Sequence, residues 1–189
     1  MWQGAARRPL TPCDLAREEA IRLAEEAAAL EENMIKGVLG RGALGAVFEA
    51  RMPCGRLVAL KLAPPGSPEE DMLRNEAMVY LVLQELWNKD VPELLLAGPL
   101  RAFRSGYALG TCLSPGRPLQ EGDADLLPAA LAILANVHAR GVIHGDLREE
   151  NFLVNEAGIA MGGAKTIMLF DFSHSSIDSD KEAQADEVD

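Results

Sequence analysis

Residues 142–154 constrain the fold of this chain more than any other stretch. Two short apolar runs bracket a polar loop that contains His144, Asp146 and Asn151. Apolar runs of this length are typical of short buried strands, so the pattern predicts a strand, a polar loop and a second strand. A hairpin with a solvated acidic turn is the plain structural alternative.

Asp146 and Asn151 stand five positions apart in this loop. Phosphoryl transfer needs a carboxylate that orients the attacking hydroxyl group and a neutral oxygen ligand for Mg²⁺. An aspartate and an asparagine supply these two groups. The loop therefore favours phosphoryl-transfer chemistry, with Asp146 and Asn151 as its candidate residues.

The composition argues against several classes of protein. A length of 189 residues suits one domain or two small lobes. A net charge of −11 argues against a nucleic-acid surface and against an anionic membrane. No apolar run reaches the ~20 residues of a membrane span. The three cysteines and three histidines lack the spacing of a metal site, and scattered cysteines predict a reducing, cytoplasmic location.

A glycine-rich segment lies between two predicted strands. Residues 34–39 and 46–51 are the strand candidates, and Gly40, Gly42 and Gly45 fall between them. A dinucleotide-binding motif would place its glycines between a strand and a helix instead. Glycines in a hairpin let backbone N–H groups approach phosphates, because no side chain intervenes.

A lysine and a glutamate are predicted to form a pair. Lys61 lies in a third predicted strand, residues 57–62, and Glu76 lies in a helix predicted over residues 69–88. Glu76 shares its helix face with apolar residues, where a carboxylate is costly unless it is paired. Lys61 is the natural partner. A solvated lysine, and a glutamate that reaches water at the edge of the stripe, are the alternatives.

The remaining pattern predicts further helices and strands. Helices are expected over residues 14–33 and 126–140, and strands over residues 92–97, 103–111 and 167–170. The first helix is acidic with a thin apolar stripe, so we expect it to pack on the surface of the first lobe. The last strand ends at Asp171-Phe172-Ser173, where Asp171 is placed either as a magnesium ligand or as a solvated strand-end residue.

The order of these motifs resembles that of the protein-kinase-like superfamily over residues 34–175. The motifs are the glycine hairpin, Val58-Ala59-Leu60-Lys61, Glu76, His144-Gly145-Asp146 with Asn151, and Asp171-Phe172-Ser173. The His-Gly-Asp form is similar to that of small atypical kinases and of antibiotic or sugar kinases. The resemblance implies an α+β, two-lobed fold. An antiparallel sheet with one helix would precede a short, mainly helical lobe, with ATP in the cleft between them.

The resemblance also implies a role for each motif. The set that binds ATP would be Gly40, Gly42, Gly45, Val47, Ala59 and Lys61. Glu76 would hold Lys61, and Asp146 would orient or deprotonate the acceptor hydroxyl. Arg148 would neutralise the γ-phosphate. Asn151 and Asp171 would hold Mg²⁺.

These roles predict an ATP- and Mg²⁺-dependent phosphotransferase that acts on protein serine or threonine. A kinase for a small hydroxylated molecule, and a non-catalytic module that binds nucleotide or a partner, are the alternatives. The expected organisation is an N-terminal extension with an acidic helix (1–33), a first lobe (34–113), a short second lobe (114–176) and an acidic tail (177–189).

Only 18 residues follow Asp171, and they contain no Ala-Pro-Glu segment. This ending fits a minimal atypical kinase, a truncated gene model, or a lobe that a protein partner completes. Gly145 occupies the position where regulated protein kinases carry an arginine that meets a phosphate on the activation loop. We therefore expect activity that does not depend on phosphorylation of such a loop.

Overall fold

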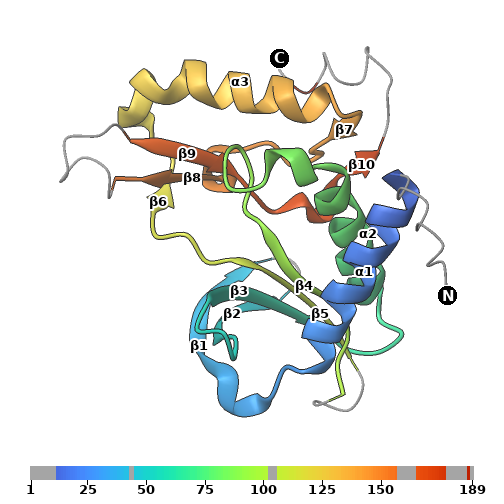
Figure 1. The fold of residues 1–189 in the computed structure, drawn as a ribbon. Coiled ribbons are helices and arrows are strands. Elements are labelled where there is room, and N and C mark those ends of the chain that lie inside the picture. The colour runs from blue at the N-terminus through green and yellow to red at the C-terminus, as the bar shows by residue number, and fades with distance from the viewer. Residues whose placement is uncertain (1–11, 43–44, 102–105, 157–164, 178–186, 188–189) are drawn as a thin grey trace, which may run out of the picture.

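The computed structural model of the chain describes residues 12–42, 45–101, 106–156, 165–177 and 187. Two lobes are visible in Figure 1: a five-stranded antiparallel sheet with two helices beside it, and a second part in which one helix lies along short strands. This is the α+β, two-lobed architecture that the sequence predicts. Within the described ranges, no helix is both long and apolar enough to cross a bilayer.

The sheet of the first lobe has the strand order β1-β2-β3-β5-β4. The strands are β1 (Ile35–Gly42), β2 (Gly45–Arg51), β3 (Leu57–Ala63), β4 (Leu94–Pro99) and β5 (Tyr107–Cys112). Val47 pairs with Lys61, and Ala59 pairs with Thr111, so β3 carries the predicted lysine in the middle of the sheet. The predicted strand over 103–111 begins only at Tyr107 within the described residues.

Helix α1 (Pro12–Ala28) packs against β4, which is one of the two edge strands of the sheet. The close approach of α1 to β4 requires a glycine on the strand, because a Cβ at Gly98 would lie 2.9 Å from the Cα of Ala24. The helix ends five residues before the predicted residue 33. Its last turn tightens when the N–H of Leu30 donates to the carbonyl of Ala27, and this stops the helical register.

Helix α2 (Pro68–Val82) is capped by Ser67, whose hydroxyl accepts a hydrogen bond from the N–H of Glu70. The helix was predicted to run to residue 88 but ends at Val82. A 3₁₀ turn over Gln84–Leu86 follows it. Asn88 then adopts a positive φ of 61°, which no helix continues through.

The second lobe combines short helices with short strands. Its elements are β6 (Arg117–Pro118), a 3₁₀ helix over Glu121–Leu126, α3 (Leu127–His138), β7 (Val142–Ile143), β8 (Phe152–Asn155), β9 (Thr166–Leu169) and β10 (Ser176–Ile177). The sheet β6-β8-β9 packs under α3, and β7 pairs with β10. The predicted strand, polar loop and strand over 142–154 are therefore β7, the loop and β8.

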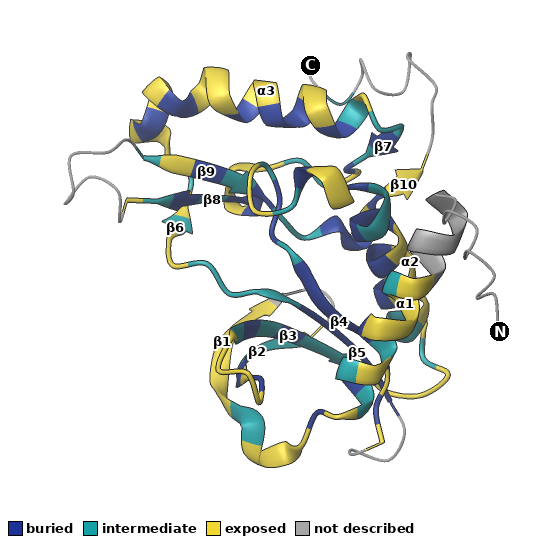
Figure 2. Cartoon of the chain, in the orientation of Figure 1, coloured by how far each residue is buried: buried dark blue, intermediate teal, exposed yellow. Residues whose placement is uncertain are grey.

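One face of α3 is buried and the other is exposed (Figure 2). The buried residues are Ala130, Ile133, Leu134 and Val137. From the apolar pattern of this segment we also expected Leu127 and Leu131 on the buried face, but these side chains are 55% and 46% exposed. Leu127 stands in the first turn, and Leu131 lies beside the i, i+3, i+4, i+7 stripe that meets the sheet.

Candidate functional site

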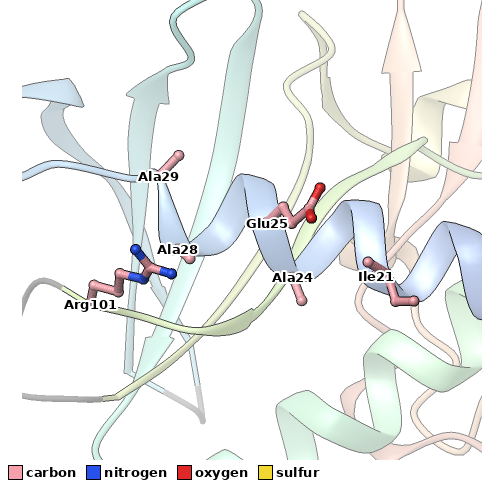
Figure 3. A pocket seen from close by; sticks show the side chains of 6 residues that line it. All are labelled: Ile21, Ala24, Glu25, Ala28, Ala29 and Arg101. Carbon is pink, nitrogen blue, oxygen red and sulfur yellow. The ribbon is translucent and has the colours of Figure 1, made fainter.

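Five of the eleven predicted site residues line a recess between the sheet and the second lobe. Its volume is about 130 Å³, and it is lined by Val47, Ala59, Lys61, Glu76, Tyr80, Leu109, Thr111, Phe170 and Asp171. A hollow along α1 is larger, at about 420 Å³, but its lining is mostly small and apolar (Figure 3). The hollow along α1 contains none of the predicted site residues, so the recess is the candidate site.

Lys61 lies at the centre of the recess. Its ammonium nitrogen is 2.9 Å from both carboxylate oxygens of Glu76 and 2.5 Å from Oδ1 of Asp171. Glu76 is 1% exposed, whereas the side chains of Lys61 and Asp171 are 17% and 29% exposed. The predicted pairing of Lys61 with Glu76 is present, and Asp171 joins it as a third member.

The charges of this cluster hold one another in place. Burial alone would lower the pKa of Lys61, but attraction to Glu76 and Asp171 outweighs it and raises that pKa. Burial raises the pKa of Glu76 in spite of Lys61. For Asp171, burial would raise the pKa, but the attraction of Lys61 outweighs it and lowers that pKa. Lys61 and Asp171 are therefore charged at neutral pH.

The backbone at Asp171 is in an uncommon conformation. Asp171 has φ 64° and ψ 65°, which is the left-handed region that few non-glycine residues adopt. The next residue, Phe172, is fully buried, with its ring centroid 5.2 Å from that of Tyr80 and 5.0 Å from that of His144. Anchoring of Phe172 holds the preceding residue in its strained conformation, and this turns the Asp171 carboxylate toward Lys61.

The loop after β7 places its polar side chains close together. The side-chain amide of Asn151 donates to the backbone carbonyl of Asp146 over 2.8 Å and lies 3.4 Å from Oδ2 of Asp146. The guanidinium of Arg148 lies 2.9 Å from the same Oδ2. Asn151 is buried, whereas the Arg148 side chain is 53% exposed. In this structure Arg148 therefore pairs with Asp146 itself.

The hairpin of β8 and β9 brings this loop to Asp171. Phe152 pairs with Leu169, and the N–H of Phe170 donates to the carbonyl of Asn151 over 2.9 Å. Asn151 therefore lies beside Phe170, the residue that precedes Asp171, although 20 residues separate Asn151 from Asp171 in the sequence.

The predicted glycine loop is the turn of the β1–β2 hairpin. Gly40 pairs with Val47, and Gly42 pairs with Gly45, which has φ 104°. A Cβ added to Gly40 or Gly45 would meet no described atom within 4 Å. The positive φ favours glycine at position 45. At Gly40, packing within the described chain gives no reason for glycine, while a closely approaching ligand would. Residues 43–44 lie outside the described ranges.

Gly145 has a structural reason of its own. Its φ is 77°, and a Cβ at this position would overlap the backbone carbonyl of His174. The loop therefore packs directly on the turn that follows Asp171. The position where regulated kinases carry an arginine has no room for a side chain here.

Sequence patterns missed two residues that hold this loop. The hydroxyl of Ser175 donates to the carbonyl of His144, and the carboxylate of Glu187 accepts hydrogen bonds from the backbone N–H groups of His144 and Gly145. Glu187 belongs to the predicted acidic tail, the rest of which lies almost entirely outside the described residues. Glu187 is one of several acidic residues in this tail, and no motif or spacing in the sequence sets it apart from the others.

Comparisons with known proteins agree on one family. No family model matches the chain. Serine/threonine-protein kinase PkaB of Streptomyces coelicolor is 30% identical over 167 residues, covering 80% of this chain and 39% of that protein. Ribosomal protein S6 kinase alpha-6 of Danio rerio is 33% identical over 161 residues, covering 77% of this chain and 21% of that protein. The chain thus spans well under half the length of these relatives.

A solved structure supports the fold. The kinase domain of Mycobacterium tuberculosis PknI, crystallised as a double mutant, superposes with a TM-score of 0.57 and 19% identity, covering 81% of this chain and 66% of that one. At this identity the likeness concerns the fold alone, and it confirms the predicted α+β, two-lobed class. With the named kinases above and the order of motifs in the cleft, it leads to one assignment: the chain belongs to the protein-kinase-like superfamily.

Proposed function

We propose that the chain is an ATP- and Mg²⁺-dependent phosphotransferase whose acceptor is a serine or threonine hydroxyl of a protein. The observation that carries this proposal is the contact of Lys61 with both Glu76 and Asp171. Glu76 is buried behind the lysine, so the groups that a ligand in the recess can reach are one ammonium and one carboxylate. The ammonium suits a phosphate, and the carboxylate suits a metal ion that accompanies it.

The donor set near Asp171 fits Mg²⁺. Asn151 uses its amide nitrogen on the carbonyl of Asp146, which leaves its amide oxygen as the remaining polar atom of the side chain. Among the described residues, no group of three or more His, Cys, Asp or Glu forms a metal cage. Mg²⁺ commonly takes one or two protein oxygens together with substrate phosphates and water, so Asp171 and Asn151 are sufficient. Bound there, Mg²⁺ would offset the charge of the phosphates.

The β1–β2 hairpin is proposed to cover the phosphates. Gly40, Gly42 and Gly45 line its end, and the backbone N–H groups of such a turn can donate to phosphate oxygens. Val47 and Ala59 present small apolar surfaces to the recess beside Lys61. These surfaces suit the flat face of a base.

Asp146 is proposed to orient or deprotonate the acceptor hydroxyl. The Asp146 side chain is 30% exposed, so an acceptor can reach it, and Asn151 fixes the backbone behind it. Arg148 is exposed and bound to Asp146 by a single ion pair, so it can exchange that partner for a γ-phosphate. The names of the related kinases favour a protein acceptor over a small molecule.

Two measurements on the purified chain test the proposal. Mg²⁺–ATP at a hundredfold excess over its Kd should stabilise the fold by about 2.7 kcal/mol, and ATP without the metal should stabilise it less. Radiolabelled phosphate should then pass from the γ-position of ATP to a serine- and threonine-rich protein. Stabilisation without transfer to any acceptor would indicate a binding module, and transfer only to sugars or aminoglycosides would indicate a small-molecule kinase. Neither stabilisation nor transfer would overturn the proposal.

A further inference from the structure

A buried carboxylate of the second lobe binds two cations outside the candidate site. The Asp123 side chain is only 4% exposed. Its two oxygens accept from the guanidinium of Arg117 over 2.6 Å and 2.8 Å, and Oδ1 also accepts from Nζ of Lys165 over 3.1 Å. Oδ2 accepts a further hydrogen bond from the N–H of Gln120 over 3.1 Å. A carboxylate that leaves water needs such donors, and two cations and one backbone N–H supply them here.

The contact of Arg117 with Asp123 is bidentate. Two parallel hydrogen bonds between a guanidinium and a carboxylate fix the orientation of both groups. The Arg117 guanidinium holds the pKa of Asp123 well below its usual range, so this carboxyl group is ionised at neutral pH. Arg117 also lies 2.7 Å from Glu156, but the Glu156 side chain is 47% exposed, and water and salt weaken such a pair. Asp123 is therefore the group that holds the guanidinium.

Arg117 is the first residue after a segment that runs from the sheet to the second lobe (Figure 1). This connector, residues 113–116, joins β5 to β6. At its first-lobe end, the N–H of Leu113 donates to the carbonyl of Leu57 over 3.0 Å. At its second-lobe end, Arg117 pairs with Val154 of β8. The carboxylate that holds this arginine therefore fixes the connector where it enters the second lobe.

The connector begins beside the surfaces that are proposed to meet the base. Ala59 of β3 pairs with Thr111 of β5, and both residues line the recess. Leu57 and Leu113 lie two positions from this pair along the chain, so they face the same side of the sheet. In the described part of the chain, no backbone hydrogen bond involves residues 114–116. The polar groups of this backbone can therefore pair with the edge of a base whose flat face lies on Ala59.

We infer that Asp123 is a positioning residue: through Arg117 it holds the connector backbone where that backbone can hydrogen-bond the base of ATP. This inference rests on the proposed function, because it takes ATP as the ligand of the recess. Asp123 touches neither the nucleotide nor the metal ion in this account. Its influence passes through Arg117 and the connector backbone.

This role of Asp123 separates the base of the nucleotide from its phosphates. The groups proposed to hold the phosphates are the β1–β2 hairpin and Lys61, which belong to the first lobe and have contacts of their own. Inorganic tripolyphosphate has the same phosphate chain without the base. A looser connector should therefore weaken the binding of ATP and leave the binding of tripolyphosphate unchanged. The net loss of one hydrogen bond corresponds to about tenfold in Kd.

Asp123→Asn in the full chain is the test, and Glu156→Gln is the matched control. Asparagine keeps the size of the side chain but turns an NH₂ group toward the guanidinium, so the bidentate pair is lost. Glu156→Gln removes the other carboxylate that contacts Arg117, which is the exposed one. Titration calorimetry of the wild type and both variants, with Mg²⁺–ATP and with Mg²⁺–tripolyphosphate, measures the two dissociation constants.

Amide exchange measures the connector itself, without any ligand. The N–H of Leu119 donates to the carbonyl of Phe152 over 2.9 Å, just beyond Arg117, and the N–H of Leu113 marks the opposite end. In Asp123→Asn, exchange at Leu119 should be faster, and exchange at Leu113 should be unchanged. In Glu156→Gln, neither should change.

We expect Asp123→Asn to raise the Kd of Mg²⁺–ATP about tenfold at an unchanged Kd of Mg²⁺–tripolyphosphate, with neither effect in Glu156→Gln. A loss of stability alone would not produce this difference between the two ligands. An unchanged Kd of Mg²⁺–ATP, an equal rise for both ligands, an equal effect of Glu156→Gln, or unchanged exchange at Leu119 would overturn the role of Asp123. Should Asp123→Asn not fold, Arg117→Lys keeps the charge but lacks the planar fork, and the same outcomes apply to it.

The wild type distinguishes this inference from the proposed function. A wild type that binds Mg²⁺–ATP more tightly than Mg²⁺–tripolyphosphate, together with a variant of equal preference for ATP, overturns the role of Asp123 alone. A wild type that binds the two ligands equally, or neither, overturns the proposed ATP site and with it this role. Exchange at Leu119 would then still decide whether Asp123 holds the connector.

Discussion

The two polar groups of the cleft are assembled in different ways. Lys61, Glu76 and Asp171 come from β3, α2 and the segment after β9, and they meet as a mostly buried ionic cluster. Asp146 and Asn151 come from one short loop, in which Asn151 is buried but Asp146 and its partner Arg148 are 30% and 53% exposed. The first group depends on the packing of both lobes, whereas the second depends on the loop.

This difference predicts different consequences of mutation. A change in the buried cluster leaves charges without partners, so it should affect stability and ligand binding together. A change in the exposed loop should affect chemistry with little effect on stability, because partly exposed ion pairs contribute little. The following predictions test this separation.

Asp146→Asn should have the largest effect. Loss of a positioned general base lowers rates by about 10²–10⁴-fold. The fold and the affinity for Mg²⁺–ATP should be nearly unchanged, because an asparagine can still accept from Asn151. Single-turnover transfer and thermal stabilisation by Mg²⁺–ATP measure the two properties separately.

Asp171→Asn is the control for that separation. It should impair the Mg²⁺-dependent part of ATP binding, since it removes the carboxylate of the proposed metal site. An equal loss of ATP affinity in Asp146→Asn and Asp171→Asn would contradict separate roles for the two aspartates.

Lys61→Met should have the second-largest effect. It leaves the carboxylate of Glu76, which is 1% exposed, without its cation, and such an orphaned charge costs about 3–5 kcal/mol. Adding Glu76→Gln should restore most of this stability, because the buried group is then neutral. Neither variant should regain stabilisation by Mg²⁺–ATP. Denaturant unfolding without nucleotide measures the stability of each variant, and unfolding with Mg²⁺–ATP measures its stabilisation by the ligand.

A different result would change the assignment of Lys61. If Lys61→Met keeps wild-type stability and wild-type stabilisation by Mg²⁺–ATP, Lys61 is a surface lysine and the cluster has no part in binding. If the double variant is less stable than the single one, Glu76 has a packing role that its charge does not explain.

The same contrast explains what could be predicted from sequence. The Asp146–Asn151 loop depends on local spacing, and the Lys61–Glu76 pair could be deduced from an acid on an apolar helix face. The contact of Asp171 with Lys61 requires the β8–β9 hairpin and the packing of Phe172, which no local pattern encodes. Glu187 lay in an acidic tail with no periodicity. The roles assigned to all these residues stay predictions.

Element ends show a similar division. The start of α2 was predictable from the acids that follow Ser67. Its end was predicted six residues too late, because the apolar stripe continues into the 3₁₀ turn over Gln84–Leu86, where Leu86 is buried. A buried residue after a helix resembles another turn of that helix when only the sequence is read.

Gly145→Ala should have an intermediate effect. A left-handed alanine costs about 1–2 kcal/mol, and the clash with the carbonyl of His174 adds about 1–3 kcal/mol of overpacking. Gly66→Ala is the matched control, because Gly66 has φ 71° but nothing within 4 Å of an added Cβ. Gly66→Ala should therefore lose only the unfolding free energy that the left-handed backbone costs an alanine, about 1–2 kcal/mol. Equal losses of unfolding free energy in the two variants would show that the loop does not need the close approach at Gly145.

The smallest effect concerns pH and the ring of His144. Burial lowers the pKa of His144, although the Phe170 carbonyl and the carboxylates of Glu187, Asp171 and Asp146 oppose that shift. Nε2 donates to Phe170, and Nδ1 has no hydrogen-bond partner among the described residues, so a proton on Nδ1 would be buried and unpaired.

A depressed histidine pKa makes the unfolded state bind more protons than the folded state below about pH 6.5. Stability should therefore fall as the pH drops from about 6.5 toward the folded pKa, and it should be independent of His144 above that range. His144→Gln can still donate to the Phe170 carbonyl but does not titrate in this range. Melting temperatures at pH 7.5, 6.5 and 5.5 should decline more steeply for the wild type than for His144→Gln. Parallel declines would assign the acid sensitivity to carboxylates such as Asp171, whose lowered pKa also favours the folded state above its titration. The buried ionic cluster, rather than the Asp146 loop, would then set the acid limit of the fold.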